Sequence, residues 1–320
     1  MMWLSDQVVD RLRATIELPD LSGTRYRALR LIARGGMGAV WLAEDTTLNR
    51  KVALKILDPA YTQGTLAARL LQEAEILANL EHPGIVPVHD AGTLADGSVF
   101  YCMKFVQGHT LEQHIPNLRS LSERLRLIQR LAEPVAYAHS KGVLHRDLKP
   151  ENIMIGPFGE VLVMDWGLAK RIGAPDAKQD EELNASVARS VPATGVVGTP
   201  GYMSPEQAQG ASADERSDIF SLGAVMVFVL ANSERPFGSL HRPLQAICTK
   251  AMAADPADRY QSVADLTADV DHFVEQLPIT AYKENSYERL QRFAIRHGAA
   301  IVLICAYLLM RILFIIFNRR

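Results

Sequence analysis

The feature that most narrows what this chain can fold into is a polar string of eight residues, His145-Arg146-Asp147-Leu148-Lys149-Pro150-Glu151-Asn152. The triplet Asp165-Trp166-Gly167 begins thirteen residues after its end. Phosphoryl transfer asks little covalent chemistry of a protein, because it needs mainly one acid near the attacking hydroxyl and oxygen ligands for Mg²⁺. Asp147 is suited to the first task, and the Asn152 amide and the Asp165 carboxylate are suited to the second. The string and the triplet together therefore predict a site for a metal-bound nucleotide.

A second group of residues, earlier in the chain, is suited to holding phosphates. Gly35-Gly36-Met37-Gly38 lies between two strand-like runs, where a glycine-rich turn can lay its backbone N–H groups over phosphates. In Val52-Ala53-Leu54-Lys55, strand alternation puts the Lys55 ammonium on the face of Ala53, from which it can reach the α- and β-phosphates. Glu73, on the helical stretch that follows, is predicted to hold Lys55 through an ion pair. Glu75 is the alternative partner, but it is two residues off that face.

Composition excludes some classes of function. The chain has 320 residues and 48% apolar residues, enough for a sizeable core. Its formal net charge of −2 leaves no surplus of basic charge for a nucleic-acid backbone, so nucleic-acid binding is disfavoured. Its three cysteines are widely spaced in apolar surroundings, which predicts buried, reduced thiols at Cys102, Cys248 and Cys305. The first thirty residues lack the apolar core of a secretion signal, so the bulk of the chain is expected in the cytosol.

The hydrophobic pattern changes along the chain from β-like to helical. The β-like part predicts strands at Tyr26–Ala33, Ala39–Glu44, Lys51–Leu57 and Val99–Phe105, with one helix over Thr65–Asn79. The later part predicts helices over Ser122–Lys141, Asp218–Leu230 and Gln245–Ala254, and a short strand pair around Ile153–Val163. Residues 1–25 predict a short helix and linker, and residues 171–198 a mobile loop.

In these motifs and their order, the chain resembles the bacterial, eukaryotic-like serine/threonine protein kinases over about residues 26–277. Further matching segments are Gln72–Ala74, His82–Val86, Gly198–Glu206 and Asp218–Gly223. The resemblance implies an α+β, two-lobed protein-kinase fold with a β-rich N-lobe at 26–106 and a helical C-lobe at 107–277. It also implies that the γ-phosphate of ATP passes, with Mg²⁺, to serine or threonine hydroxyls of protein substrates.

The resemblance implies roles for individual residues. Met103 would guard the adenine pocket, and the hinge from Lys104 to Val106 would present backbone groups to the adenine. Lys149 would contact the γ-phosphate, braced by Thr199. The residues implied to line the ATP site are Ala33, Gly35, Gly36, Met37, Gly38, Val40, Ala53, Lys55, Met103, Lys104 and Val106. The implied catalytic residues are Asp147, Lys149, Lys55 and Glu73, the implied metal ligands are Asn152 and Asp165, and the implied buried ion pair of the C-lobe is Glu206 with Arg259.

The resemblance also implies switching by phosphorylation, because family members use the arginine that matches Arg146, directly before Asp147, to bind a phosphorylated activation loop through strong bidentate hydrogen bonds. The hydroxyls nearest the Thr199 motif are Ser190 and Thr194, which we predict as autophosphorylation sites. The alternative is that these residues belong only to a solvated linker.

Three departures from the family pattern keep other functions open. Ala33 replaces the first glycine of the nucleotide loop, which restricts the turn. Trp166 replaces the usual phenylalanine, a larger ring that can still pack under the helix bearing Glu73. From Phe237 to Leu244 the chain lacks a helix that family members use to dock substrates. The shortened segment and Ala33 support a pseudokinase or scaffold as an alternative. Gly198–Glu206 disfavours a third class, a kinase of small molecules.

The C-terminal segment, residues 299–317, is apolar except for Arg311. As a helix its nineteen residues span about 28 Å, close to the ~30 Å hydrocarbon core of a bilayer. A transmembrane helix is predicted, with a buried helix of the C-lobe as the alternative. The basic residues before it place the kinase domain on the cytosolic side of the cytoplasmic membrane. Residues 278–298 are expected to form a juxtamembrane segment resting on anionic lipid, or a solvated linker, and residues 318–320 a short tail. Signal reception is then expected through a partner or through a homodimer.

Overall fold

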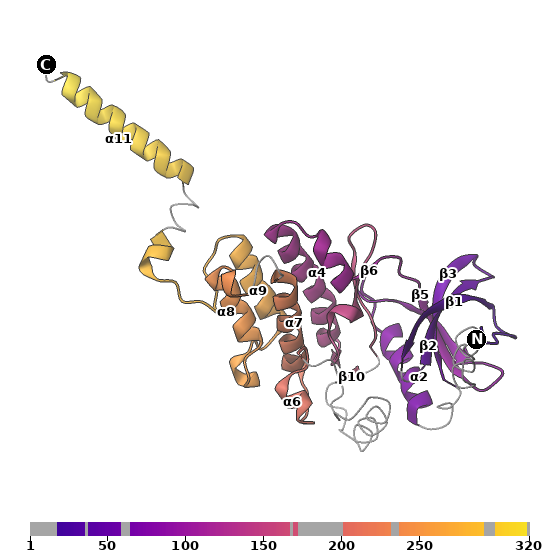
Figure 1. Ribbon diagram of the computed structural model, residues 1–320. Coiled ribbons are helices and arrows are strands. Elements are labelled where there is room, and N and C mark those ends of the chain that lie inside the picture. The colour runs from indigo at the N-terminus through magenta and orange to yellow at the C-terminus, as the bar shows by residue number, and fades with distance from the viewer. Residues whose placement is uncertain are drawn as a thin grey trace, which may run out of the picture.

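The computed structural model describes residues 18–35, 38–58, 65–166, 169–171, 201–231, 237–290 and 298–318. Within them the chain forms a β-rich lobe and a helical lobe that lie side by side, joined by the segment after strand β5 (Figure 1). The α+β, two-lobed prediction is therefore confirmed.

The N-lobe is built on an antiparallel sheet of five strands in the order β1-β2-β3-β5-β4. The strands are β1 (Tyr26–Gly35), β2 (Gly38–Asp45), β3 (Arg50–Leu57), β4 (Val88–Thr93) and β5 (Val99–Lys104), and helix α2 (Thr65–Ala78) lies on one face. Ala53 and Tyr101 belong to the core that includes α2, whereas Val52, Leu54 and Cys102 belong to a separate core on the opposite face. This alternation puts Lys55 and Tyr101, directly opposed on β3 and β5, on the α2 side of the sheet.

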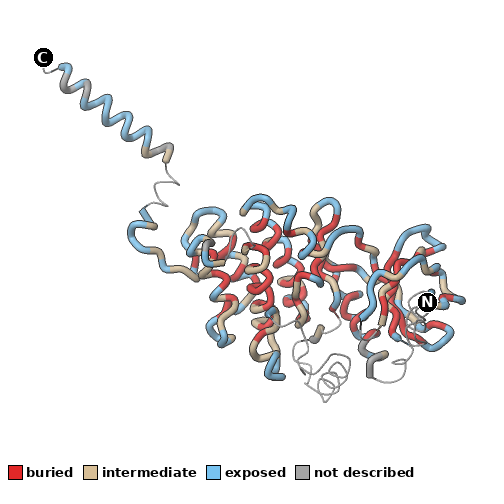
Figure 2. The backbone as a smooth tube through the Cα atoms, viewed as in Figure 1, coloured by how far each residue is buried: buried red, intermediate tan, exposed pale blue. Residues whose placement is uncertain are grey.

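The C-lobe is a set of packed helices, and the residues on their inward faces are mostly buried (Figure 2). They are α3 (Leu111–His114), α4 (Leu121–Ser140), α6 (Pro205–Ala208), α7 (Glu215–Leu230), α8 (Arg242–Ala251) and α9 (Val263–Val274). Helix α4 begins at a capping box, in which Ser120 accepts from the Glu123 N–H and the Glu123 side chain returns to the Ser120 N–H. Helix α7 is buried on most of its circumference, which makes it the central helix of this lobe.

Short strands and 3-10 turns connect the helices of the C-lobe. A three-stranded sheet contains β6 (His109–Thr110), β8 (Ile153–Ile155) and β9 (Val161–Val163), and β7 (Val143–Leu144) pairs with β10 (Lys170–Arg171). The 3-10 turns are η2 (Ile115–Asn117), η3 (Pro150–Asn152), η4 (Phe237–Ser239) and η5 (Pro256–Asp258). The string 145–152 thus lies between β7 and β8, with η3 as its last turn.

Most predicted elements are present with small shifts at their ends. Helix α8 begins at Arg242 rather than Gln245 because Pro243 occupies its first turn, where the missing N–H costs nothing. Strand β4 was not predicted. Between Phe237 and Leu244 the structure has only η4 before α8, as expected from the short sequence. The helix predicted within residues 1–25 and the loop predicted over 171–198 lie almost wholly outside the described residues.

Helix α11 (Gly298–Asn318) coincides with the apolar C-terminal segment and lies apart from the two lobes (Figure 1). Its large apolar side chains are exposed, and so is Cys305. The prediction of three buried thiols is therefore wrong for Cys305 and correct for Cys102 and Cys248. The reason is that Cys305 lies on α11, away from both lobe cores. Over the described part of the chain, no helix meets the combined length and apolarity that a membrane span requires.

Candidate active site

A four-residue ionic cluster joins the two lobes. The Lys55 ammonium lies 2.9 and 3.0 Å from the two Glu73 carboxylate oxygens and 3.0 Å from Oδ1 of Asp165. The predicted Lys55–Glu73 pair is thus present, whereas Glu75, the alternative, is exposed on α2. The fourth member is Tyr101, whose hydroxyl donates to Oε1 of Glu73 at 2.7 Å.

The charges of this cluster are strongly coupled. Burial alone would lower the pKa of Lys55, but Tyr101 and the two carboxylates raise it well above its ordinary value. The Lys55 ammonium in turn lowers the pKa of Asp165. Both groups are therefore charged at neutral pH. About half of the Asp165 side chain is exposed, which leaves this carboxylate open to a ligand between the lobes.

A second cluster surrounds Asp147. The Lys149 ammonium lies 2.8 Å from Oδ2 of Asp147. The Asn152 amide nitrogen donates to the same carboxylate oxygen at 3.0 Å and to the Asp147 carbonyl at 2.9 Å. Because its nitrogen is committed to Asp147, the amide of Asn152 turns its oxygen Oδ1 the other way. Asp147, Lys149 and Asn152 are thereby held as a unit.

The backbone at both clusters is held in an unusual conformation. Arg146 and Asp165 have φ angles of 68° and 54°, a left-handed region that costs a non-glycine residue about 1 kcal/mol or more. The buried carboxylate of Asp218 on α7 fixes the first of these, since it accepts the His145 and Arg146 N–H groups, each at 2.8 Å. Strained residues persist only where their surroundings over-determine them, and they cluster at functional sites.

Asp218 also accepts a hydrogen bond from Nε2 of His139 at 2.8 Å. Burial would raise the pKa of Asp218, but the hydrogen bond from His139 and the approach of His145 outweigh it, and the pKa lies below its ordinary value. An ionised Asp218 can accept all three N–H groups. The string was expected to act through Asp147, and sequence reasoning gave neither Asp218 nor His139 a role.

His145 and Trp166 connect the two clusters. Their rings lie 4.6 Å apart between centroids, and Trp166 is almost fully buried, its indole donating to the Val163 carbonyl at 3.3 Å. Nδ1 of His145 accepts the Asp147 N–H at 3.2 Å, and Nε2 faces the Met164 carbonyl at 3.0 Å. These two hydrogen-bond partners fit a His145 ring that carries its proton on Nε2 and accepts at Nδ1. Trp166 is thus part of the main hydrophobic core, and its indole N–H adds a hydrogen bond that a phenylalanine cannot make.

The residues predicted to line the ATP site lie along β1, β2, β3 and β5. Ala53 and Met103 are buried and directly opposed on β3 and β5, and Val40 packs against the same core. Ala33 pairs with Val40, while Lys104 is exposed and Val106 buried at the start of the hinge. Gly35 and Gly38 end β1 and begin β2. Gly36, Met37, Ser190, Thr194 and Thr199 lie outside the described residues.

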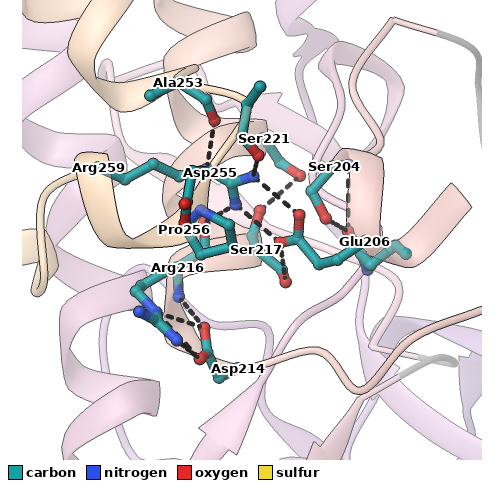
Figure 3. A network of polar contacts seen from close by, with 12 residues as sticks. Ser204, Glu206, Asp214, Arg216, Ser217, Ser221, Ala253, Asp255, Pro256 and Arg259 are labelled. Carbon is teal, nitrogen blue, oxygen red and sulfur yellow. Dashed lines mark hydrogen bonds and ion pairs between the residues drawn. The ribbon is translucent and has the colours of Figure 1, made fainter. Parts of the chain in front are cut away.

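The predicted ion pair of the C-lobe is present beneath α6 (Figure 3). Two guanidinium nitrogens of Arg259 lie 2.7 and 2.8 Å from the two oxygens of Glu206. Arg259 also donates to three carbonyls, those of Ala253, Arg216 and Ala254. The Arg259 side chain is fully buried, so these acceptors replace water around a permanent charge. The pair fixes α6 to α7 and to the turn before α9.

Known proteins show the same domain. The sequence matches the protein kinase domain family over residues 26–291. It is 36% identical to the serine/threonine-protein kinase PknD of Protochlamydia amoebophila, over 78% of this chain and 30% of that protein. It is 38% identical to PknD of Chlamydia muridarum, over 76% of this chain and 31% of that protein. The chain thus spans about a third of the length of these relatives.

Solved structures agree with the sequence comparison. The kinase domain of Mycobacterium tuberculosis PknI is 26% identical, with a TM-score of 0.59 over 80% of this chain and 99% of that one. The family match over residues 26–291 includes both lobes and the residues of both clusters. The chain belongs to the protein kinase family.

Proposed function

We propose that this chain is a serine/threonine protein kinase that transfers the γ-phosphate of ATP to hydroxyls of protein substrates. The observation that carries the proposal is the simultaneous assembly of both clusters, Lys55 with Glu73 and Asp165, and Asp147 with Lys149 and Asn152. Phosphoryl transfer depends almost entirely on positioning and electrostatic stabilisation, and these six side chains supply both.

Mg²⁺-ATP fits the residues present. The described residues contain no group of three or more His, Cys, Asp or Glu side chains able to hold a metal alone. Magnesium is usually held by one or two carboxylates together with substrate phosphates, and Asp165 and Asn152 offer one carboxylate and one amide oxygen for that role. The Asp165 carboxylate and Oδ1 of Asn152 would hold it. The bound metal would neutralise charge that develops on the transferred phosphoryl group.

Asp147 and Lys149 would act on the two reactants. The Asp147 carboxylate orients the substrate hydroxyl and accepts its proton, as its place at the centre of the second cluster permits. Lys149, 2.8 Å from Asp147, carries a positive charge toward the same point and would contact the γ-phosphate. Lys55 would bind the α- and β-phosphates.

Two aspects of the proposal rest on sequence similarity. Protein substrates and serine/threonine preference are supported by Gly198–Glu206, the segment that resembles the peptide-facing platform of the family, and by the relatives named as serine/threonine-protein kinases. Autophosphorylation at Ser190 or Thr194 is supported by Arg146, whose guanidinium would bind the new phosphate.

We also propose, from the apolar sequence of residues 299–317, that this segment anchors the kinase in the cytoplasmic membrane as a single pass with the kinase domain in the cytosol, although α11 over its described residues falls short of the combined length and apolarity of a membrane span. Large apolar side chains project from it into solvent, with exposed fractions of 66% for Val302, 70% for Leu303 and 61% for Leu309. Exposure of that much apolar surface is unfavourable in water and favourable in lipid. Lys283 and Arg289 precede the helix on the proposed cytosolic side. Two anchored copies would meet at raised local concentration, which favours a homodimer.

Transfer to an added protein tests the first proposal. The purified chain, incubated with Mg²⁺ and radiolabelled ATP, is expected to label serine or threonine in casein. Asp147→Asn is expected to reduce the rate by about a hundredfold or more, since general-base catalysis contributes ~10²–10⁴-fold. Glu44→Gln, which removes a partly buried carboxylate paired with the exposed Arg27 at the far end of β2, serves as the matched control and is expected to stay near the parent rate. Equal labelling by parent and Asp147→Asn would refute the proposal, and ATP binding without any transfer would favour a scaffold.

Flotation with lipid vesicles tests the anchor. The full chain is expected to float with vesicles containing anionic lipid and to stay there in high salt. Replacement of both Leu303 and Leu309 by Asp is expected to release it, because each central carboxylate costs about 2.5–3.5 kcal/mol in a membrane helix. Leu48→Asp, at an exposed leucine of the β2–β3 turn, is the matched control. Vesicle binding that survives the double substitution would contradict the anchor.

A further inference from the structure

We propose that Tyr101 is a positioning residue for phosphoryl transfer, which holds Glu73 in place while Lys55 binds the nucleotide. This inference rests on the proposed kinase function and names a residue that no motif in the sequence points to. Tyr101 lies on β5, directly opposite Lys55 on β3, and both side chains extend toward α2. Its hydroxyl donates to Oε1 of Glu73 at 2.7 Å.

The first argument comes from the hydrogen bonds that Lys55 can make. An ammonium has three N–H donors, and in this structure three carboxylate oxygens surround it at 2.9, 3.0 and 3.0 Å. A nucleotide phosphate that binds Lys55 must therefore accept an N–H group that donates to one of these oxygens in the nucleotide-free structure. If that N–H group is the one bonded to Oε1 of Glu73, the Tyr101 hydroxyl still donates to this oxygen.

The second argument is the cost of a buried carboxylate. The Glu73 residue is 5% exposed, so water does not replace a lost partner. Without a second donor, Glu73 loses stabilisation at the moment when Lys55 engages a phosphate, and α2 is no longer held against the sheet from β5. The tyrosine gives Glu73 tethers from two different strands.

The third argument concerns the state of the tyrosine. Burial raises the pKa of Tyr101 well above its ordinary value, Lys55 opposes this effect, and Glu73 adds to it. The phenol is therefore protonated at neutral pH and can donate to Glu73. A hydrogen bond from a neutral donor to a carboxylate is short and roughly twice as strong as one between neutral groups. The Tyr101 ring also lies near the Lys55 ammonium, 5.7 Å from its centroid to Nζ.

Tyr101→Phe tests the proposal, because it removes the hydroxyl and keeps the ring. Loss of a hydrogen bond to a charged group predicts a fall of about tenfold in kcat/KM for ATP. Most of it is expected as a higher KM, since Lys55 contacts the phosphates before and during transfer. Tyr26→Phe is the matched control: Tyr26 is also buried in the N-lobe sheet and also donates to a carboxylate, Asp90 at 2.9 Å, but it lies in the core on the face opposite α2. It is expected to stay within about twofold of the parent.

A double-mutant cycle separates positioning from a purely structural effect. If Tyr101 acts through Glu73, Tyr101→Phe has little further effect on kcat/KM in a Glu73→Gln background. An equal loss in both backgrounds, or a Tyr101→Phe enzyme within about twofold of the parent, would overturn the proposal. If Tyr101→Phe does not fold, Tyr101→Met, which fills the space with a flexible apolar chain, takes its place.

Hydrogen exchange keeps the test independent of the kinase activity. Amide exchange in α2 is expected to be faster in Tyr101→Phe than in the parent and in Tyr26→Phe, with exchange in α4 unchanged. Unchanged exchange in α2 would count against the tether even if the parent proved to transfer no phosphate. A parent without transfer would refute the proposed function alone.

Discussion

Replacing Glu206 by Gln is expected to destabilise the protein by about 3 kcal/mol at neutral pH. Burial would raise the pKa of Glu206, but hydrogen bonds from Arg259 and Ser217 outweigh it and lower the pKa from 4.5 to about 2. At ~1.4 kcal/mol per pKa unit, the difference between these values corresponds to about 3 kcal/mol of folding free energy. The estimate from burial agrees, since removing one partner of a buried ion pair costs about 3–5 kcal/mol. Arg259, fully buried, would keep its charge and its carbonyl partners but lose the carboxylate.

The sign of the pH dependence follows from the lowered pKa. The carboxylate contributes its full stability above the unfolded-state pKa of 4.5, and this stability is lost as pH falls toward the folded-state value of about 2. Glu206→Gln has no such group to titrate. The difference in unfolding free energy between parent and variant is therefore expected to be about 3 kcal/mol at pH 7 and about 1.4 kcal/mol at pH 3.

Urea unfolding followed by tryptophan fluorescence measures this difference, because Trp41 and Trp166 are buried in the two lobes. Asp214→Asn is the matched control, since the Asp214–Arg216 pair is closely spaced but its side chains are 48% and 32% exposed. An exposed pair contributes about 0–1 kcal/mol, and asparagine caps a helix as well as aspartate. A Glu206→Gln cost below about 1 kcal/mol, or a cost that does not shrink in acid, would refute the reasoning.

Three further results are expected. Gly38→Ala should weaken ATP binding and lower the melting temperature, because the new Cβ would lie 2.2 Å from the Ile56 carbonyl oxygen. Gly35→Ala meets no atom within 4 Å and should have a milder effect, and calorimetric titration and thermal melts compare the two variants. Asp269→Asn should expose the segment after α9 to limited proteolysis, because the buried carboxylate accepts hydrogen bonds from Tyr260, Thr280 and Ala281 at 2.7–2.9 Å. Asp265→Asn, on the exposed first turn of α9, should leave this segment as resistant as in the parent. A water-soluble maleimide should label Cys305 alone in the folded protein, because burial raises the pKa of the Cys248 thiol to about 12 and also raises the pKa of Cys102, and vesicles should protect Cys305 from the reagent. Mass spectrometry counts the adducts, and labelling of all three thiols would contradict the buried assignments.

The strands and helices with strong local patterns could be predicted from the sequence. The alternation in β3, the short apolar run of β5, the periodic stretch of α4 and the long apolar run of α7 are each set by residues within one element. Strand β4 has no such pattern: Val88–Thr93 contains Asp90 and Gly92, is only partly buried, and forms the edge of the sheet through its pairing with β5. Its conformation depends on a neighbouring strand rather than on its own side chains.

The candidate site divides in the same way. Asp147, Lys149 and Asn152 are close in sequence, so their spacing alone predicts their proximity. Asp218 reaches the string from seventy-three residues away, and Tyr101 reaches Glu73 across twenty-eight. Asp218 opens the segment Asp218–Gly223 that resembles the family, but the spacing along the chain does not connect it to the string, and Tyr101 lies in no matching segment. For Tyr101 the available signal was only its place on the strand predicted over Val99–Phe105, because the pairing of that strand with the strand of Lys55 is seen first in the structure.

Intact-mass spectrometry of the phosphatase-treated chain, incubated with Mg²⁺-ATP beside its Asp147→Asn variant, tests the central claim most directly. The account predicts added phosphates on the parent, mapping to Ser190 or Thr194, and none on the variant. Phosphate added equally to both proteins, or to neither while both bind ATP, would contradict the claim that Asp147 lies at the centre of a phosphoryl-transfer site.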